Sequence, residues 1–282
     1  MAKTFTLDGL EVRAVSVAGM ETCIELPSLK TCFDIGHGHR STARNHTVLF
    51  THAHIDHMGG IAHHAATRSM LSMSPPTYVV PKAVVGGVER LLEAFRSLDG
   101  SEIPATIKGL KPGESMPLGK RWTVRPLPSF HPVPSQGYAL MERRKRLKAD
   151  LQGAGREAIQ QAAIRGEQIN EELEHPKLVF SGDTTIEFIE HSTIAQQADI
   201  LIMEVTFIDD RVSVASARKN GHIHLDEVIE RADLFQNKAI LFTHLSARYR
   251  EHEAKQVLAS RLPDALKDKE WTRDMMVIDG LG

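Results

Sequence analysis

Residues 51–57 read Thr-His-Ala-His-Ile-Asp-His and place three imidazoles and one carboxylate in a very short stretch. They follow the apolar run 48–50, so they come at the end of a predicted strand. Histidines two residues apart share one face of an extended chain. Imidazole nitrogen and carboxylate oxygen together suit zinc or a similar divalent ion. The segment therefore predicts a metal site with the ligands His52, His54, Asp56 and His57.

Three further residues of ligand type each follow an apolar run, namely His131, Asp183 and His244. In sheet-based α/β folds, sites gather beyond the carboxyl ends of strands. Seven groups are too many for one zinc ion and suit two. One ion takes His52, His54 and His131, the other takes Asp56, His57 and His244, and Asp183 bridges them. Two ions about 3.5–4 Å apart hold a hydroxide between them and lower the pKa of that water.

The elements that must position these residues are short strands interrupted by helices. Predicted strands are 12–17, 23–26, 30–34, 47–50, 122–127, 138–141, 178–180, 200–204, 239–243 and 275–278. Predicted helices are 59–73, 82–98, 225–232 and 254–262, where apolar residues recur at spacings of three and four. This order indicates sheets covered by helices in one α/β or α+β domain spanning residues 1–282.

The composition of the 282 residues is that of an ordinary soluble protein, with 41% hydrophobic and 25% charged residues. A net charge of −2 excludes a globally basic nucleic-acid coat, so any bound polyanion must meet a local basic patch. Two cysteines exclude a disulfide framework and a four-thiolate zinc site. They favour a reducing compartment, and without a visible secretory signal or membrane-spanning run we expect a cytoplasmic protein.

The set of seven ligand-type residues resembles the signature of the metallo-β-lactamase superfamily. Further segments are similar to tRNase Z, the endonuclease that matures the 3′ end of tRNA. Residues 131–138, His-Pro-Val-Pro-Ser-Gln-Gly-Tyr, resemble its H-x-x-x-S-x-G-Y segment. Residues 202–207 look like its HEAT segment, from which Met203 and Val205 depart, and residues 221–224 fall where its HST segment lies. Residues 222–249 look like the short, plant-type tRNase Z.

This resemblance implies an αβ/βα four-layer sandwich, two zinc ions per chain with manganese as a possible replacement, and a homodimer. It also implies that Glu204 and His222 act as a pair that protonates the departing 3′ oxygen, because a carboxylate orients an imidazolium and favours its charged form. Asp56 is expected to orient the hydroxide. From the residues alone, Glu204 reads as a strand-end salt-bridge residue and His222 as a polar residue at a helix start. We expect a structural role for His224.

In the family, a long flexible arm that grips the tRNA elbow lies between the H-x-x-x-S-x-G-Y and GDT segments. Here that interval holds only residues 142–176, which we interpret as a surface insertion in place of a full arm. Its basic start is either a set of phosphate contacts or a solvated helix start. The candidate RNA contacts are Arg248, Arg40, Arg143, Arg144, Lys145, Arg146 and Lys148.

The sequence is therefore interpreted as a zinc-dependent endoribonuclease that removes the 3′ trailer from precursor tRNA by means of a metal-bridged hydroxide. The alternative is a hydrolase of a small phosphodiester or ester on the same scaffold, which the short arm and the slightly acidic chain favour. A further alternative is a non-catalytic metal-binding or RNA-binding scaffold, which the complete ligand set opposes.

Overall fold

Two β-sheets form the centre of the computed structural model, which describes residues 2–267. The first sheet has the strand order β1-β2-β3-β4-β5-β6-β7, and β14 extends it beside β2. Strands β4 to β7 are parallel, so their carboxyl ends meet at one edge. The bounds are β1 (Lys3–Leu7), β2 (Leu10–Ala18), β3 (Glu21–Leu26), β4 (Thr31–Phe33), β5 (Thr47–Leu49), β6 (Thr77–Pro81), β7 (Thr106–Leu110) and β14 (Leu245–Ser246).

The second sheet has the order β13-β12-β11-β10-β9-β8. Strands β11, β12 and β13 are parallel, and β9 runs the same way because β10 is antiparallel to both β9 and β11. The bounds are β8 (Met116–Leu118), β9 (Trp122–Pro128), β10 (Gln136–Leu147), β11 (Asn170–Phe180), β12 (Ile200–Glu204) and β13 (Ala239–Thr243).

Successive side chains of a strand point to opposite faces of its sheet, and in these sheets both faces are buried. In β12, Ile200 and Ile202 face the other sheet, while Leu201 and Met203 face helices. The same holds in β5, where Leu49 faces the opposite sheet and Val48 faces helices. Burying such a side chain contributes about 1.5–3 kcal/mol. The apolar residues of both sheets therefore form one inner core and two outer ones.

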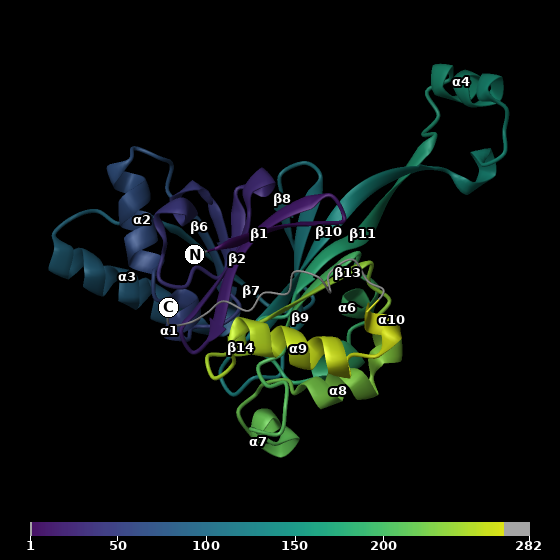
Figure 1. Cartoon of the computed structure of the whole chain (residues 1–282). Coiled ribbons are helices and arrows are strands. Elements are labelled where there is room, and N and C mark those ends of the chain that lie inside the picture. Colours follow the sequence, from purple (N-terminus) through teal and green to yellow (C-terminus); the bar gives the residue numbers. More distant parts are fainter. Residues whose placement is uncertain (1, 268–282) are drawn as a thin grey trace.

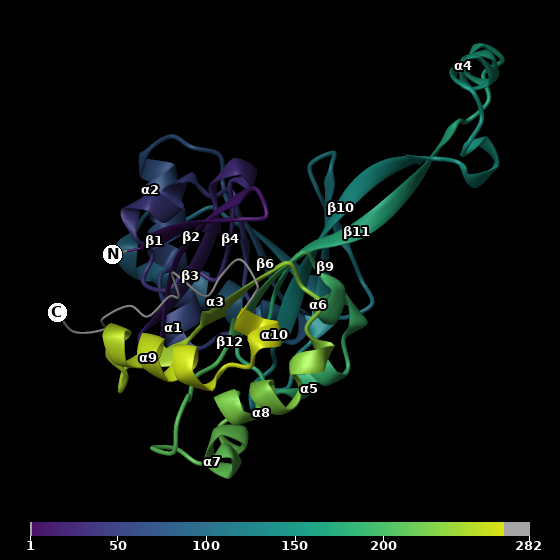
Figure 2. The same ribbon diagram turned by 45° about the vertical axis from the view of Figure 1, so that its right-hand side comes forward.

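Helices cover both outer faces and complete the αβ/βα sandwich (Figures 1 and 2). One side carries α1 to α3 and the other carries α5, α6 and α8 to α10. The helices are α1 (Ile55–Met58), α2 (Ile61–Met70), α3 (Val85–Asp99), α4 (Arg156–Ile164), α5 (Glu187–Glu190), α6 (Thr193–Gln197), α7 (Val214–Lys219), α8 (Leu225–Glu230), α9 (Glu251–Arg261) and α10 (Asp264–Lys267). Short 3-10 helices are η1 (Pro27–Leu29), η2 (Arg40–Arg44), η3 (Lys82–Val84), η4 (Ala149–Leu151) and η5 (Ala232–Leu234).

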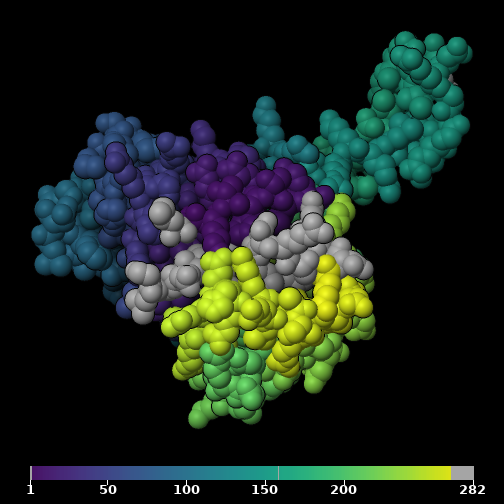
Figure 3. All heavy atoms as spheres, in the orientation of Figure 1, coloured from purple at the N-terminus to yellow at the C-terminus, as the bar shows by residue number. Residues whose placement is uncertain are grey.

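A two-stranded arm projects from the second sheet and carries α4 at its tip (Figures 1 to 3). Strand β10 pairs with β9 only as far as Glu142, and beyond that point it pairs with β11 alone. At the base of the arm, the buried Asp199 accepts hydrogen bonds from Arg144 at 3.3 Å and Lys177 at 3.4 Å. This ion-pair cluster ties both strands of the arm to the start of β12.

Most of the predicted strands and helices within residues 2–267 are present, with ends shifted by a few residues. The helix start considered at residues 143–148 is wrong, because 143–147 lie in β10 and α4 begins later, at Arg156. The predictions missed β1, β6, β7, β8 and β14. The predicted strand 275–278 lies outside the described residues. None of the helices within residues 2–267 is long and apolar enough to cross a bilayer.

Candidate metal centre

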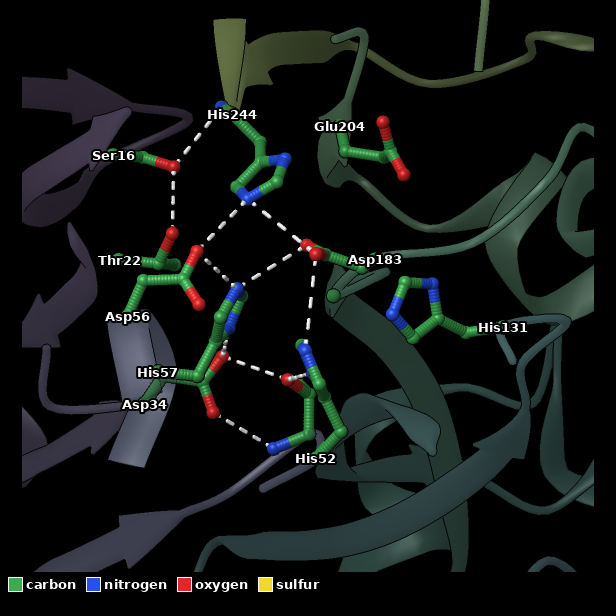
Figure 4. Close-up of polar contacts among 12 residues, drawn as sticks. Ser16, Thr22, Asp34, His52, Asp56, His57, His131, Asp183, Glu204 and His244 are labelled. Carbon is green, nitrogen blue, oxygen red and sulfur yellow. Dashed lines mark hydrogen bonds and ion pairs between the residues drawn. The ribbon is translucent and has the colours of Figure 1, made fainter. Parts of the chain in front are cut away.

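The predicted ligands all lie just beyond strand ends, where the two sheets meet. His52 and His54 follow β5, and Asp56 and His57 lie in the single turn of α1. The second sheet contributes the three others directly after β9, β11 and β13, namely His131, Asp183 and His244. Figure 4 shows His52, His57 and His244 directed at Asp183, with Asp56 facing His57 and His244. The structure thus brings together seven residues that span almost two hundred positions.

The spacing of the ligand atoms matches that of a metal site. Nε2 of His57 lies 3.4 Å from Oδ1 of Asp183, and Nε2 of His244 lies 3.4 Å from Oδ2 of the same residue. Asp56 Oδ2 is 3.6 Å from both of these ring nitrogens. Tetrahedral zinc ligands at about 2.0–2.2 Å from the ion lie about 3.3–3.6 Å from one another. The atoms therefore surround spaces of the size that a small divalent ion occupies.

The residues fall into overlapping groups. His52, His54, His131 and Asp183 form one, Asp56, His57 and His244 form another, and a third joins Asp183, His222 and His244. In each group, the ligand atoms lie within 4.8 Å of one another. The Asp183 carboxylate lies between the groups, because it faces His52 of the first group and His57 and His244 of the second, which is the placement that a bridging ligand requires.

Four of the imidazoles leave a buried nitrogen without a hydrogen-bond partner in the described part of the chain. These atoms are Nε2 of His52, His57, His131 and His244. On each ring the other nitrogen, Nδ1, lies within hydrogen-bond distance of an acceptor oxygen: Thr51 Oγ1, Asp34 Oδ2, Gly221 O and Thr206 Oγ1. A buried polar atom without a partner costs about 1–3 kcal/mol. Four lone pairs that converge without donors therefore fit metal cations.

Asp34 is the main positioning residue that the sequence did not reveal. It is fully buried, accepts a hydrogen bond from Nδ1 of His57 at 2.7 Å, and takes two more from the backbone and hydroxyl of Thr51 at 2.8 Å each. Because the Thr51 hydroxyl donates to Asp34, it accepts from Nδ1 of His52 at 3.0 Å. One carboxylate thus fixes the tautomers of two ligand rings. The only sequence signal is its position directly after β4.

Ser16 of β2 positions His244, the ligand-type residue that comes last in the sequence. Its hydroxyl accepts the backbone N–H of His244 at 2.9 Å. His244 has a positive φ of 58°, which turns its ring back toward the other ligands. The first sheet therefore holds a ligand that belongs to the end of the second.

The electrostatics keep both carboxylates ionised. Burial favours the neutral form of Asp183, but the nearby His244 and His57 hold its pKa well below the usual value. For Asp56, burial is likewise outweighed by His244 and His57, which lower the pKa to about 2. Burial, reinforced by the charge of His57, lowers the pKa of His52, so that ring is neutral. Burial disfavours the charged ring of His57, but Asp183 and Asp34 raise its pKa well above the usual value, so a metal ion that binds this ring displaces its proton.

Glu204 and His222 form a hydrogen-bonded pair beside this cluster. Nδ1 of His222 donates to Oε1 of Glu204 at 3.0 Å, and the His222 ring lies 5.5 Å from the His131 ring and 5.3 Å from the His244 ring. Burial disfavours the charged ring, but the charge and hydrogen bond of Glu204 outweigh it and raise the pKa of His222 to about 9. The pair can hold a proton at the edge of the cluster.

His224 has a structural role. Its Nδ1 accepts the backbone N–H of Asp226 at 3.1 Å, and its Nε2 donates to the carbonyl of Asp209 at 3.0 Å. The ring therefore caps the start of α8 and is buried.

The candidate RNA contacts are scattered. Arg248 lies over the Phe207 ring at 6.0 Å and lines a cavity shared with His222. Arg40 starts η2. The five candidates between residues 143 and 148 lie on the arm, in β10 or just after it. There Arg144 pairs with Glu142, and Arg146 pairs with Glu171. Of these candidates, Arg248 is the one that shares a cavity with His222 of the predicted centre.

We expect Asp34→Asn to weaken metal binding about 10- to 100-fold, because an amide is a poorer acceptor for the His57 ring than a carboxylate. Metal analysis after dialysis against a graded chelator measures this. Asp199→Asn is the matched control, since Asp199 is also buried and charge-paired but lies at the opposite end of β12. Equal metal retention in the two variants would refute the role of Asp34.

Comparison with known proteins agrees with this geometry. A family model described as a beta-lactamase superfamily domain matches residues 31–245. The chain is 38% identical to tRNase Z TRZ1 of Arabidopsis thaliana, over 95% of this chain and 96% of that protein. It is 34% identical to the chloroplastic tRNase Z TRZ2 of the same plant, over 91% of this chain and 73% of that protein.

Solved structures show the same fold at low identity. The short form of human tRNase Z superposes with a TM-score of 0.53 at 18% identity, covering 85% of this chain and 87% of that one. The metallo-beta-lactamase fold protein YhfI of Bacillus subtilis superposes with a TM-score of 0.56 at 17% identity, covering 86% and 89%. With its ligand-type residues at the sheet ends and this likeness along nearly its whole length, the chain belongs to the tRNase Z family of the metallo-β-lactamase superfamily.

Proposed function

We propose that this protein is a metal-dependent endoribonuclease that cleaves the 3′ trailer from precursor tRNA. Two relatives that align with more than nine tenths of the chain carry the name tRNase Z. The observation that carries the proposal is the His222–Glu204 pair at the edge of the ligand cluster. A phosphodiester with an alkoxide leaving group needs such a proton donor.

Two zinc ions per chain, replaceable by manganese, are part of this proposal. His52, His54 and His131 would hold one, Asp56, His57 and His244 would hold the other, and Asp183 would contact both. When bound, such a pair supplies a water of lowered pKa and neutralises charge on the phosphoryl oxygens. The partnerless Nε2 atoms and the two-sided placement of Asp183 support this division.

The chain's own residues then complete the reaction. Asp56 uses Oδ2 toward His57, His244 and the backbone N–H of Gly19, while Oδ1 makes no hydrogen bond to any described residue. That oxygen is available to orient the attacking water. The oxygen of this water, which has released one proton to solvent, bonds to phosphorus as the bond between phosphorus and the 3′ oxygen breaks. The 3′ oxygen leaves with the proton from Nε2 of His222. The products are a tRNA with a 3′ hydroxyl and a trailer with a 5′ phosphate.

We infer that the chain is one domain from which residues 142–176 project as an arm. The ion pairs of Asp199 and the shared inner core of the two sheets support this organisation. The segment carries seven basic and seven acidic residues, so its net charge is zero. Lys148 forms no side-chain hydrogen bond or ion pair with any residue from 2 to 267, and with Arg248 it is the best candidate for phosphate contacts.

A homodimer is a further part of the proposal, supported by an apolar surface between α1 and α3. Ile55 and Leu98 are 79% and 86% exposed, and Leu91 and Phe95 line a cavity of about 690 Å³ beside them. Large exposed apolar patches mark interfaces. We expect Phe95→Glu to convert a dimer into a monomer, measured by light scattering. A monomeric wild-type chain would refute this part.

The location we propose is a reducing compartment such as the cytoplasm. Cys23 and Cys32 lie buried on neighbouring strands and are both free. A free pair of this kind is usual where thiols are kept reduced.

The function is tested with zinc-loaded protein and a precursor tRNA carrying a labelled trailer. We expect one cut at the trailer junction, leaving a 3′ hydroxyl on the tRNA. His222→Ala should keep its metal and lose about 10²–10⁴ in rate, because only the proton donor is removed. Cleavage rate and metal content are measured on the same preparation.

Two outcomes would contradict these roles. His222 also lies within reach of Asp183 and His244, so metal loss in His222→Ala would make it a ligand rather than a proton donor. Hydrolysis of a small phosphodiester such as bis(p-nitrophenyl) phosphate, without any cut in precursor tRNA, would favour the small-substrate alternative.

Glu204→Gln should move the alkaline limb of the kcat/KM profile to lower pH. A histidine with a raised pKa is protonated below that value and loses its proton as the pH rises through it, here about 9. Glutamine keeps an acceptor oxygen but removes the negative charge that favours the imidazolium. Bound cations lower the pKa of His222 in the wild type by repulsion, so the direction of the shift is the measured quantity. An alkaline limb that stays in place in Glu204→Gln would exclude His222 as the titrating acid.

A further inference from the structure

A second charged pocket lies at the opposite edge of the first sheet from the metal ligands. Its lining includes Lys30, which precedes β4, and His46, which precedes β5, whereas Asp34 and His52 follow the carboxyl ends of the same strands. The cavity measures about 700 Å³, within the range of small-ligand sites. Strands β2 and β3 form one wall, and the end of α2 closes another.

The centre of the pocket wall is a buried arginine without a carboxylate partner. Arg68 is 2% exposed, and its guanidinium donates to the carbonyl oxygens of Ala43, Asn45 and Ser74. No carboxylate of residues 2–267 lies within ion-pair distance of it. Carbonyl groups satisfy its N–H donors but leave its full positive charge in place.

Two more cations line the pocket without partners. Lys30 and Arg44 are exposed, and neither forms a side-chain hydrogen bond or ion pair with any residue from 2 to 267. His46 adds no charge, because burial first and the charge of Arg68 second lower its pKa. Cations that converge without partners repel one another and attract an anion.

The single carboxylate in the pocket offsets only part of this charge. Glu25 is buried and accepts hydrogen bonds from Ser41 at 3.1 Å and Asn45 at 2.8 Å. Arg13, the remaining cation of the lining, pairs instead with Glu11 outside the pocket at 3.1 Å. Positive groups therefore outnumber negative ones in the lining, although the chain as a whole carries −2.

We propose that this pocket is a phosphate-binding site separate from the catalytic centre, with Lys30 and Arg44 as its movable contacts and Arg68 as its fixed charge. No phenylalanine, tyrosine or tryptophan lines it, and the small His46 ring is the single aromatic surface among its lining residues, so base stacking contributes little. Recognition rests on the phosphate group itself. That group comes either from a small free phosphate compound or from the backbone of a bound RNA.

The first experiment titrates inorganic phosphate into the zinc-loaded protein at constant ionic strength and follows the unfolding temperature. The test variant is Lys30→Gln/Arg44→Gln. The matched control is Lys111→Gln/Lys120→Gln, which removes the same charge from exposed lysines elsewhere. Phosphate bound at the metal ligands stabilises all three proteins equally, so only the difference between them reports on the pocket.

We expect the phosphate concentration for half-maximal stabilisation to rise about tenfold or more in Lys30→Gln/Arg44→Gln and to stay unchanged in the control, since each charged hydrogen bond contributes about that factor. Both changes are at exposed positions, so the variants should fold. Identical titrations of all three proteins would overturn the proposal.

The second experiment separates the two sources of phosphate. The KM and kcat for precursor tRNA are measured with the same variants at several salt concentrations. A raised KM with unchanged kcat and a shallower salt dependence assigns the pocket to the RNA backbone. An unchanged KM together with lost phosphate stabilisation assigns it to a free phosphate compound.

Discussion

The fold buries carboxylates and imidazole nitrogens together at one point, and no hydrogen-bond donor of the described chain satisfies them there. Asp183 and the rings of His52, His57 and His244 are almost completely buried, and each ring presents an Nε2 atom that no described group satisfies. In a protein interior this arrangement is unfavourable until cations enter it. The two sheets make it possible because the carboxyl ends of β5 in one and of β9, β11 and β13 in the other meet at the same place.

A second layer of hydrogen bonds turns this collection of side chains into a fixed geometry. Glu204 shows how closely the layers are joined, because one oxygen accepts from His222 and the other accepts from the Thr206 hydroxyl at 2.6 Å. That hydroxyl in turn accepts from Nδ1 of His244 at 3.1 Å. A single carboxylate therefore orients both the candidate proton donor and a candidate ligand. The distance between the donor and the metal ligands is fixed by the end of one strand, β12.

The sequence predicted which side chains come together beyond the sheet ends because most of them follow strands that are largely apolar. Such strands are recognisable from the sequence alone. Because sites gather at the carboxyl ends of strands, the polar residues that follow them are predicted to share one site. Asp34 escaped prediction because its role depends on the register of β4 beside β5, which places it against Thr51 from another part of the chain. Strand β6 was missed because its apolar run is short and lies between Pro76 and Pro81, and β7 was missed because Gly109 interrupts its pattern.

The arm shows why a linear charge pattern is a poor guide to an interaction surface. The basic run beginning at Arg143 looks like a phosphate grip until the chain returns along β11. The register then sets Arg143 opposite Glu174, Lys145 opposite Glu172 and Arg146 opposite Glu171. Opposite charges on facing strands stabilise the ribbon and cancel its field at a distance. Attraction for a polyanion in this protein must therefore come from cations that lack such partners, and those are found on the body as well as on the arm.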